Sequence, residues 1–223
     1  MDEATIGILG GTGALGAGLA LRWAAAGRPV VIGSRDADRA TARAEELRGQ
    51  LPETAGSLTG AENSRAAEAG TVVVSVPFAS AAATVDGVAD RLQDTVLVSA
   101  VVPLAFDGGG PHVAVVDGAG SAAELLAERA PEARVVGAFH SVAAAALADL
   151  STPLEDDVLL CGDDDAAVDH VAELVRDLDG AHPVPAGALR LAGPIEGLTA
   201  VLIGVNKRHR AHVGLRLTRL PRD

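Results

Sequence analysis

The chain has 223 residues, 48% of them hydrophobic, and carries 30 acidic against 18 basic side chains, for a formal net charge of −12. This length suits one large domain, or one domain with a small addition, with ample material for a core. The negative charge argues against a nucleic-acid partner, and no apolar run reaches transmembrane length. The single cysteine, Cys161, cannot form an internal disulfide and accompanies no cluster of metal ligands, so no metal site is expected. Since no secretory leader is visible, we expect a cytoplasmic location.

The first predicted element is a strand at 6–9 that runs into a glycine-rich turn and a helix. The turn has the G-x-G-x-x-G spacing of dinucleotide-binding proteins, and a second strand is predicted at 29–32; the turn reads Gly11-Thr12-Gly13-Ala14-Leu15-Gly16. Gly11 is expected to permit the tight turn, Gly13 to let the backbone approach a pyrophosphate, and Gly16 to allow close packing of the helix. The alternative is a glycine-rich turn in an unrelated α/β protein.

The end of the second strand favours NADP over NAD. An NAD site usually places a carboxylate there for the ribose 2′-hydroxyl, whereas this chain has Ser34 and Arg35, with Arg39 about one helical turn further on. Arginine offers a planar set of donors that suits a phosphate. Asp36 is interpreted as the N-cap of a helix from 37 to 48. The alternative is that these arginines are solvated surface residues.

Strands and helices then alternate, which predicts a doubly wound parallel sheet. Strands are expected at 56–59, 71–76, 96–98 and 134–138, with helices at 62–69, 79–92 and 121–129 and a glycine-rich loop around 108–110. Beyond residue 150, a strand at 157–161, a helix at 165–178 and a strand at 181–184 follow. The acidic triplet at 163–165 is interpreted as a helix-capping loop rather than a cation site.

The last predicted helix, 194–205, contains a single charged residue, Glu196, so we expect it to be largely buried, in part against a second subunit of a homodimer. The 23 residues from 201 onward carry six basic side chains and one acidic one. A basic segment on an acidic protein usually faces an anion, although surface ion pairs or a subunit contact are the alternatives.

Ligands of such sheets bind at the carboxyl ends of the strands, where Phe78, Pro103 and His140 are predicted to lie. Phe78 suits either a ring contact or core packing, and His140 either a ligand contact or a structural role. The chain has no tyrosine, so the Tyr-x-x-x-Lys pair of short-chain dehydrogenases is excluded. The absence of an evident acid–base pair favours hydride exchange between two redox cofactors, without a catalytic side chain.

Several segments in this order resemble one family, the NADPH-dependent reductases of the deazaflavin coenzyme F420. They are the opening glycine turn, Gly33-Ser34-Arg35, Ser75-Val76-Pro77-Phe78, Ser99-Ala100-Val101-Val102-Pro103, Val136-Gly137-Ala138-Phe139-His140-Ser141 and Cys161-Gly162-Asp163-Asp164. The resemblance spans nearly the whole chain and implies direct hydride transfer between NADPH and the deazaflavin ring. The chain departs from the family at Phe78, where Trp is expected, and at residues 140–143, where His-Thr-Ile-Pro is expected.

The resemblance also implies a division of the site. Residues from Thr12 to Leu15 would hold the pyrophosphate, and Ser34, Arg35 and Arg39 the 2′-phosphate. The nicotinamide half would be lined by Phe78, Ala144 and a strand near Val213. The deazaflavin would be lined by Pro103, His140, Ser141, Val142 and Thr199.

We therefore expect an α/β protein with a Rossmann-type doubly wound parallel sheet and a small C-terminal α/β appendage. Residues 1–150 would form the NADP-binding domain, and 151–223 would complete the deazaflavin pocket and supply dimer contacts. The alternatives are an NADPH-dependent reductase of a small imine, ketone or metal ion, and a redox sensor that binds NADP without turnover.

Overall fold

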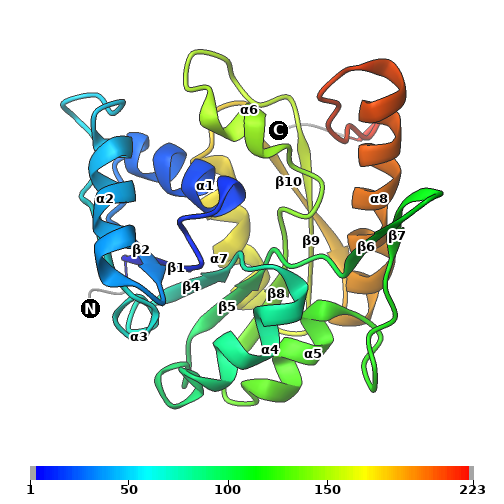
Figure 1. Ribbon diagram of the computed structural model, residues 1–223, viewed down its shortest axis with the longest axis horizontal. Coiled ribbons are helices and arrows are strands. Elements are labelled where there is room, and N and C mark those ends of the chain that lie inside the picture. Colours follow the sequence, from blue (N-terminus) through cyan, green and yellow to red (C-terminus); the bar gives the residue numbers. More distant parts are fainter. Residues whose placement is uncertain (1–3, 221–223) are drawn as a thin grey trace.

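The computed structural model describes residues 4–220. Eight strands form one sheet and two form a separate hairpin, with helices on both faces of the sheet (Figure 1). The sheet strands are β1 (Ile6–Leu9), β2 (Val30–Ser34), β3 (Leu58–Glu62), β4 (Thr71–Val74), β5 (Val96–Ser99), β8 (Arg134–Gly137), β9 (Asp157–Gly162) and β10 (His182–Gly187). The helices are α1 (Ala14–Ala25), α2 (Ala37–Arg48), α3 (Asn63–Ala66), α4 (Phe78–Asp86), α5 (Ala122–Arg129), α6 (Ala144–Ala148), α7 (Asp165–Arg176) and α8 (Ala192–His209).

The sheet has the order β10-β9-β8-β5-β4-β1-β2-β3, and the six strands from β8 to β3 are parallel, as predicted. Successive residues of one strand enter two different cores, because side chains alternate across a sheet. Ile8 packs with α1 and α7 on one face, whereas Leu9 packs with α3, α4 and α5 on the other. This two-sided burial explains why the strands are continuous apolar runs.

The C-terminal strands continue the same sheet. β9 pairs with β8 in the antiparallel direction, at Gly137 and Cys161, and β10 pairs with β9 in parallel. The expected 157–161 and 181–184 strands are thus present at the sheet edge, but the direction of the chain reverses there. Asp164 caps α7 by accepting a hydrogen bond from the Ala167 N–H at 2.7 Å, which confirms the capping interpretation of the acidic triplet.

A β-hairpin and a short helix were not predicted from the sequence. The loop around 108–110 is a hairpin of β6 (Leu104–Asp107) and β7 (Gly110–Val113), joined by the two-residue turn Gly108-Gly109. A Gly-Gly pair is a hairpin signal in its own right. The second is α6, whose five residues are too few to show a helical period.

The last helix differs most from expectation. α8 has 18 residues, and only Ala192, Ile195 and Glu196 are buried. It packs against α5 and against β7, but most of its later residues are only half-buried, and Val201 is 60% exposed. The prediction of a largely buried helix is therefore wrong for the single chain. No strand exists near Val213, because the segment after α8 has no ladder partner among the described residues.

Candidate functional site

The turn after β1 has the geometry of a phosphate-binding loop. Gly10 adopts a left-handed conformation, at φ 73°, and a Cβ at Gly11 would lie 3.0 Å from the Ile8 carbonyl oxygen, so two adjacent glycines serve the tight turn that was expected at Gly11. The Gly11 N–H donates to the Gly33 carbonyl at 3.0 Å, which joins the turn to the end of β2. Gly13 is the N-cap of α1 and offers no side chain, so the first N–H groups of the helix face outward.

The other two glycines also have separate roles. A Cβ at Gly16 would overlap the Ser75 hydroxyl and lie 2.8 Å from the Gly11 Cα, so this position requires close packing, as predicted. A Cβ at Gly13 would meet only the Gly10 carbonyl oxygen, at 3.5 Å. Gly13 is therefore dispensable for the fold itself, and its missing side chain leaves room on the exposed side of the turn.

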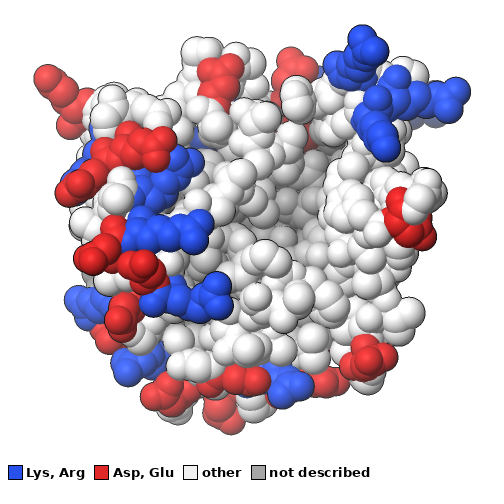
Figure 2. Space-filling model, in the orientation of Figure 1, with Lys and Arg blue, Asp and Glu red and all other residues white. Residues whose placement is uncertain are grey.

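Arg35 and Arg39 lie beside this turn. Both line a cavity of about 390 Å³ together with Ser34, Thr12 and Gly13. Figure 2 shows basic side chains over α2 at the margin of a hollowed, mostly uncharged face. Within residues 4–220, neither arginine forms an ion pair. Two cations without a carboxylate partner at the mouth of a cavity suit a phosphate group.

Asp36 does not oppose that use. Its carboxylate accepts a hydrogen bond from the Arg39 N–H at 3.1 Å and caps α2, as predicted. The Asp36 N–H in turn donates to the Ser34 hydroxyl oxygen at 3.2 Å. The Asp36 Oδ1 is therefore engaged by the helix, and the residue also lines the 390 Å³ cavity.

Asn63 is a residue of this site that sequence reasoning missed. It lines the 390 Å³ cavity and a neighbouring one of about 430 Å³, which also contains Arg35. The Gly10 N–H donates to the Asn63 Oδ1 at 3.4 Å, and a Cβ at Gly33 would lie 2.8 Å from the same oxygen. The amide thus lies between the phosphate turn and the end of β2, a position that only the tertiary structure reveals.

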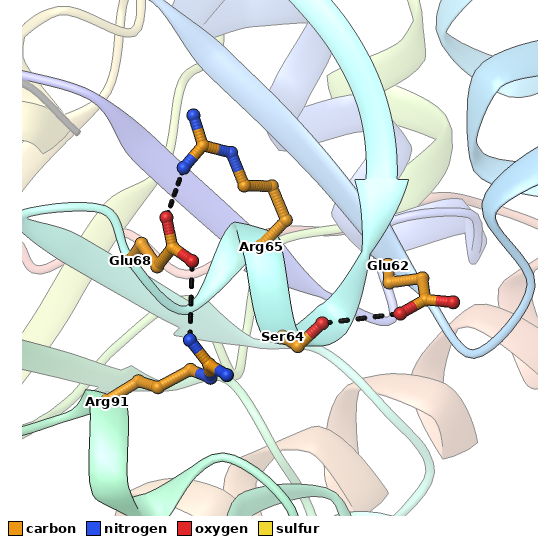
Figure 3. A network of polar contacts seen from close by, with 5 residues as sticks. All are labelled: Glu62, Ser64, Arg65, Glu68 and Arg91. Carbon is orange, nitrogen blue, oxygen red and sulfur yellow. Dashed lines mark hydrogen bonds and ion pairs between the residues drawn. The ribbon is translucent and has the colours of Figure 1, made fainter.

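Polar contacts of exposed side chains surround α3, the short helix that begins with Asn63. Glu68 forms ion pairs with Arg65 and with Arg91, the second at 3.3 Å, and the Ser64 hydroxyl donates to Glu62 at 3.4 Å (Figure 3). These pairs are at least one-third exposed, so each contributes little to stability. Their effect is to tie α3 to the segment that follows α4.

The predicted nicotinamide residues lie in three places. Ala144 begins α6 and lines a cavity of about 320 Å³ with Ala14 and Gly18 of α1. Phe78 is the first residue of α4 and is half-buried against the second core. Val213 lies after α8, where its N–H donates to the Asn206 side chain at 2.7 Å. In Figure 1, α8 lies on the opposite side of the molecule from α1 and α2, so the segment that follows α8 is separate from the turn after β1.

The predicted deazaflavin residues gather at the ends of β5 and β8. Pro103 is buried at the base of the hairpin, where its carbonyl accepts from the Ala114 N–H at 2.6 Å. His140, Ser141 and Val142 are all buried. The Thr199 hydroxyl donates to the His140 carbonyl at 2.6 Å, which brings α8 to this group.

The backbone at the end of β8 is strained. Phe139 has φ 66°, an uncommon conformation for a bulky residue, and is 1% exposed. Its ring packs edge-on against Trp23 of α1, with centroids 5.6 Å apart. The left-handed backbone at Phe139 directs its ring into the core, where the contact with Trp23 helps to hold it.

The His140 imidazole is neutral at physiological pH. Burial lowers its pKa to about 4, and the Ser99 carbonyl offsets this only in part. Neither ring nitrogen makes a hydrogen bond of normal geometry to any described residue, and the same holds for the buried Ser99 hydroxyl. The imidazole is therefore unsuited to donate a proton from a charged form.

Glu196 is the other buried ionisable group nearby. Its carboxylate accepts from the N–H groups of Ala122 and Ala123, at 2.9 and 3.0 Å, at the start of α5. Burial raises the pKa of this carboxyl, while the two N–H groups oppose the change. Because both oxygens are engaged, Glu196 anchors α8 to α5 and is not free to act on a ligand.

Two further features concern membranes and metals. None of the described helices is long and apolar enough to cross a bilayer. Residues 4–220 contain no group of three or more His, Cys, Asp or Glu side chains arranged to hold a metal ion.

Comparisons with known proteins agree with this geometry. A family model described as NADP oxidoreductase coenzyme F420-dependent matches residues 5–103. The chain is 39% identical to the F420-dependent NADP reductase of Methanothermobacter thermautotrophicus, over 97% of this chain and 95% of that protein. It is 36% identical to the protein of the same name from Methanocaldococcus jannaschii, over 96% and 98% of the two chains. A solved structure from Arthrobacter sp. FB24, provisionally assigned as an F420-dependent NADP reductase, has 28% identity and a TM-score of 0.80 over 98% of this chain and all of its own.

Proposed function

The chain belongs to the family of F420-dependent NADP reductases, and from this premise we infer how its residues divide two cofactors between them. The protein is an NADP-dependent oxidoreductase that transfers a hydride between NADP(H) and the deazaflavin coenzyme F420. The sequence motifs predicted NADP and coenzyme F420 as the two cofactors, and this prediction is confirmed. The observation that carries the assignment is the near full-length identity to curated reductases of this name.

For NADP(H), we propose the turn and the two arginines as the site. The N–H groups from Thr12 onward would bind the pyrophosphate, and Ser34, Arg35 and Arg39 would bind the 2′-phosphate. Asn63 would position the turn against the end of β2. This use is supported by the shared cavity and by the lack of a carboxylate partner for either arginine in the described chain.

For the deazaflavin, we propose the group formed by Pro103, His140, Ser141, Val142 and Thr199. The two cofactors supply the redox chemistry, with the hydride passing from one ring to the other. The protein then has to hold two flat rings at about 3–3.5 Å and exclude water. A neutral, buried His140 suits that task, because the hydride passes between the rings without a side-chain acid or base, and the proton that reduction of the deazaflavin also consumes can come from solvent.

We also propose a division along the chain. Residues 1–150 would bind NADP, and 151–223 would complete the deazaflavin pocket, since Thr199 reaches His140 from α8. The cytoplasmic location expected from the composition stays a prediction, which cell fractionation would test.

A homodimer is proposed on the exposed face of α8. Val201 is 60% exposed, and the hairpin packed beside α8 presents Phe106 at 68% and Val113 at 43% exposure. Such an apolar surface typically marks an interface, here with a second copy of the chain. Val201→Glu should convert a dimer to a monomer in sedimentation velocity. A wild-type protein that already sediments as a monomer at micromolar concentration refutes the dimer.

The function itself is tested by stoichiometry. Purified protein should oxidise one NADPH for each deazaflavin reduced, followed by absorbance, and should leave a panel of imines and ketones unreacted. Oxidation of NADPH with an imine or ketone but not with F420 would place the protein among other NADPH reductases. Binding of NADPH with no oxidation by any acceptor would instead indicate a sensor.

A further inference from the structure

The end of α8 and the segment after it carry a group of basic side chains, here called the C-terminal basic cluster. All of them are exposed: Lys207, Arg208, Arg210, Arg216 and Arg219. Arg222, counted with the tail in the sequence, lies outside the described residues. Within the described chain none of the five forms an ion pair, whereas arginines elsewhere, such as Arg176 and Arg129, do. On a chain of net charge −12, this is a concentrated and uncompensated positive surface (Figure 2).

Two explanations that need no ligand account for only part of the cluster. Cations in the last turn of a helix interact favourably with its carbonyl groups, which explains Lys207 and Arg208. That effect fades within one turn, so it does not extend to Arg216 and Arg219. Pairing with acidic loops is the other explanation, and the described structure contains no such pair.

The segment that presents the later arginines is held in a fixed course. Asp156 accepts from the Leu215 N–H at 3.1 Å, and Asp157 from the Leu217 N–H at 2.5 Å. The Leu215 carbonyl accepts from the Asp157 N–H at 2.7 Å. Asp156 and Asp157 are 6% and 0% exposed, so these two buried carboxylates hold the backbone of the segment through its amides. A fixed segment loses less conformational entropy when it binds an anion.

The cluster begins on the same helix that carries Thr199, a residue of the proposed deazaflavin group. Thr199 contacts the His140 carbonyl, and Lys207 is eight residues further along the same helix. At 1.5 Å per residue, the two are about 12 Å apart along the helix axis. Figure 2 shows the basic side chains at the edge of the hollow, over the end of α8. A side chain that extends from a ring bound near His140 can span this distance.

We propose that the C-terminal basic cluster binds the acidic, phosphate- and carboxylate-bearing tail of the deazaflavin substrate. This rests on the proposed function, because it assigns the ring of the same molecule to the group around His140. The rest of the acidic protein repels a polyanion, so a local positive surface is needed to attract it. The tail thereby contributes binding that is independent of the ring contacts.

The test compares F420 with a deazaflavin that lacks the acidic tail. The first variant carries Lys207→Gln, Arg208→Gln and Arg219→Gln. The control variant carries Arg129→Gln, Arg134→Gln and Arg176→Gln. It makes the same change in net charge at surface positions outside the cluster. In the first variant the KM for F420 should rise about tenfold at low salt, from three exposed contacts, with kcat unchanged. The KM for the tail-less deazaflavin and the affinity for NADPH should stay at the wild-type values.

The wild-type KM for F420 should also rise with ionic strength, and that dependence should weaken in the first variant. The proposal would be overturned by an equal change in KM for both deazaflavins, or by an equal change in KM in the control variant. It would also be overturned if the first variant became a monomer, because the cluster would then belong to a subunit contact. If the wild-type protein reduces the tail-less deazaflavin and F420 with the same KM, the tail does not bind and only this proposal fails. If it reduces neither, the proposed function fails.

Discussion

Arg35 offers the sharpest test of the NADP site. Arg35→Gln keeps a polar side chain but removes the positive charge that would face the 2′-phosphate. The lost charge-assisted hydrogen bond is worth about 1.5 kcal/mol, the low end of its range, because Arg35 is exposed and water screens the charge. Since about 1.4 kcal/mol is a factor of ten, kcat/KM for NADPH should fall about tenfold. NADH lacks the 2′-phosphate, so its kcat/KM should change less than about twofold.

The assay is deazaflavin reduction at fixed F420, with NADPH and NADH as alternative donors. Arg48→Gln is the matched control, because Arg48 lies on the same helix α2 but is paired with Glu45 at 3.6 Å and lines none of the cavities described above. The control should keep the wild-type preference for NADPH. Equal losses with both donors in Arg35→Gln would refute the assignment, since they would indicate a general effect on the fold or on the nicotinamide half.

Three further predictions concern the turn, the second cavity and the buried imidazole. Gly13→Ala should weaken NADP binding, measured by calorimetry, and leave the free energy of unfolding unchanged. Gly16→Ala should lower the free energy of unfolding by about 1–3 kcal/mol in urea denaturation, because its Cβ overlaps the Ser75 hydroxyl. Similar losses of stability in both variants would contradict these separate roles. Asn63→Ala should raise the KM for NADPH several-fold and leave that for F420 unchanged, and a change confined to F420 would exclude Asn63 from the NADP site. Because the folded-state pKa of His140 is lowered from 6.5 to about 4, the unfolded chain binds the proton more readily and stability is lost as pH falls through this window. His140→Leu should therefore remove about 2 kcal/mol of the loss in unfolding free energy measured between about pH 7 and pH 5; parallel curves for variant and wild type would show that the imidazole is not held neutral by the fold.

The sequence predicted most of the sheet because its local signals are strong. Continuous apolar runs identify strands buried on two faces, and Asp36 and Asp164 mark their helices by capping them. The reversal of β9 was not predictable, because an apolar run has no direction. The exposure of α8 was hidden for a related reason: an apolar helix reads the same whether its partner lies in its own chain or in another.

The site was predicted unevenly for physical reasons. The residues of the glycine turn are contiguous, so their spacing alone predicted the turn between strand and helix, whereas the left-handed conformation of Gly10 appears only in the structure. Asn63 lies at the end of another strand, and its side chain accepts a hydrogen bond from the Gly10 N–H. The two residues are 53 positions apart in the sequence, so no local pattern reveals the pair. His140 was placed at a strand end by pattern, but its burial and its neutral state depend on packing by residues distant in sequence.

The edge-on contact between Trp23 and Phe139 has a consequence for how the two cofactors are brought together. Trp23 belongs to the helix that begins at the phosphate turn, and its indole N–H donates to the Leu174 carbonyl at 2.8 Å; Phe139 directly precedes His140. The two proposed halves of the site, for donor and acceptor, thus share one close-packed interior. The separation of the two rings is then a property of core packing, so a smaller residue at Phe139 should slow the hydride step itself and leave the affinity for each cofactor nearly unchanged.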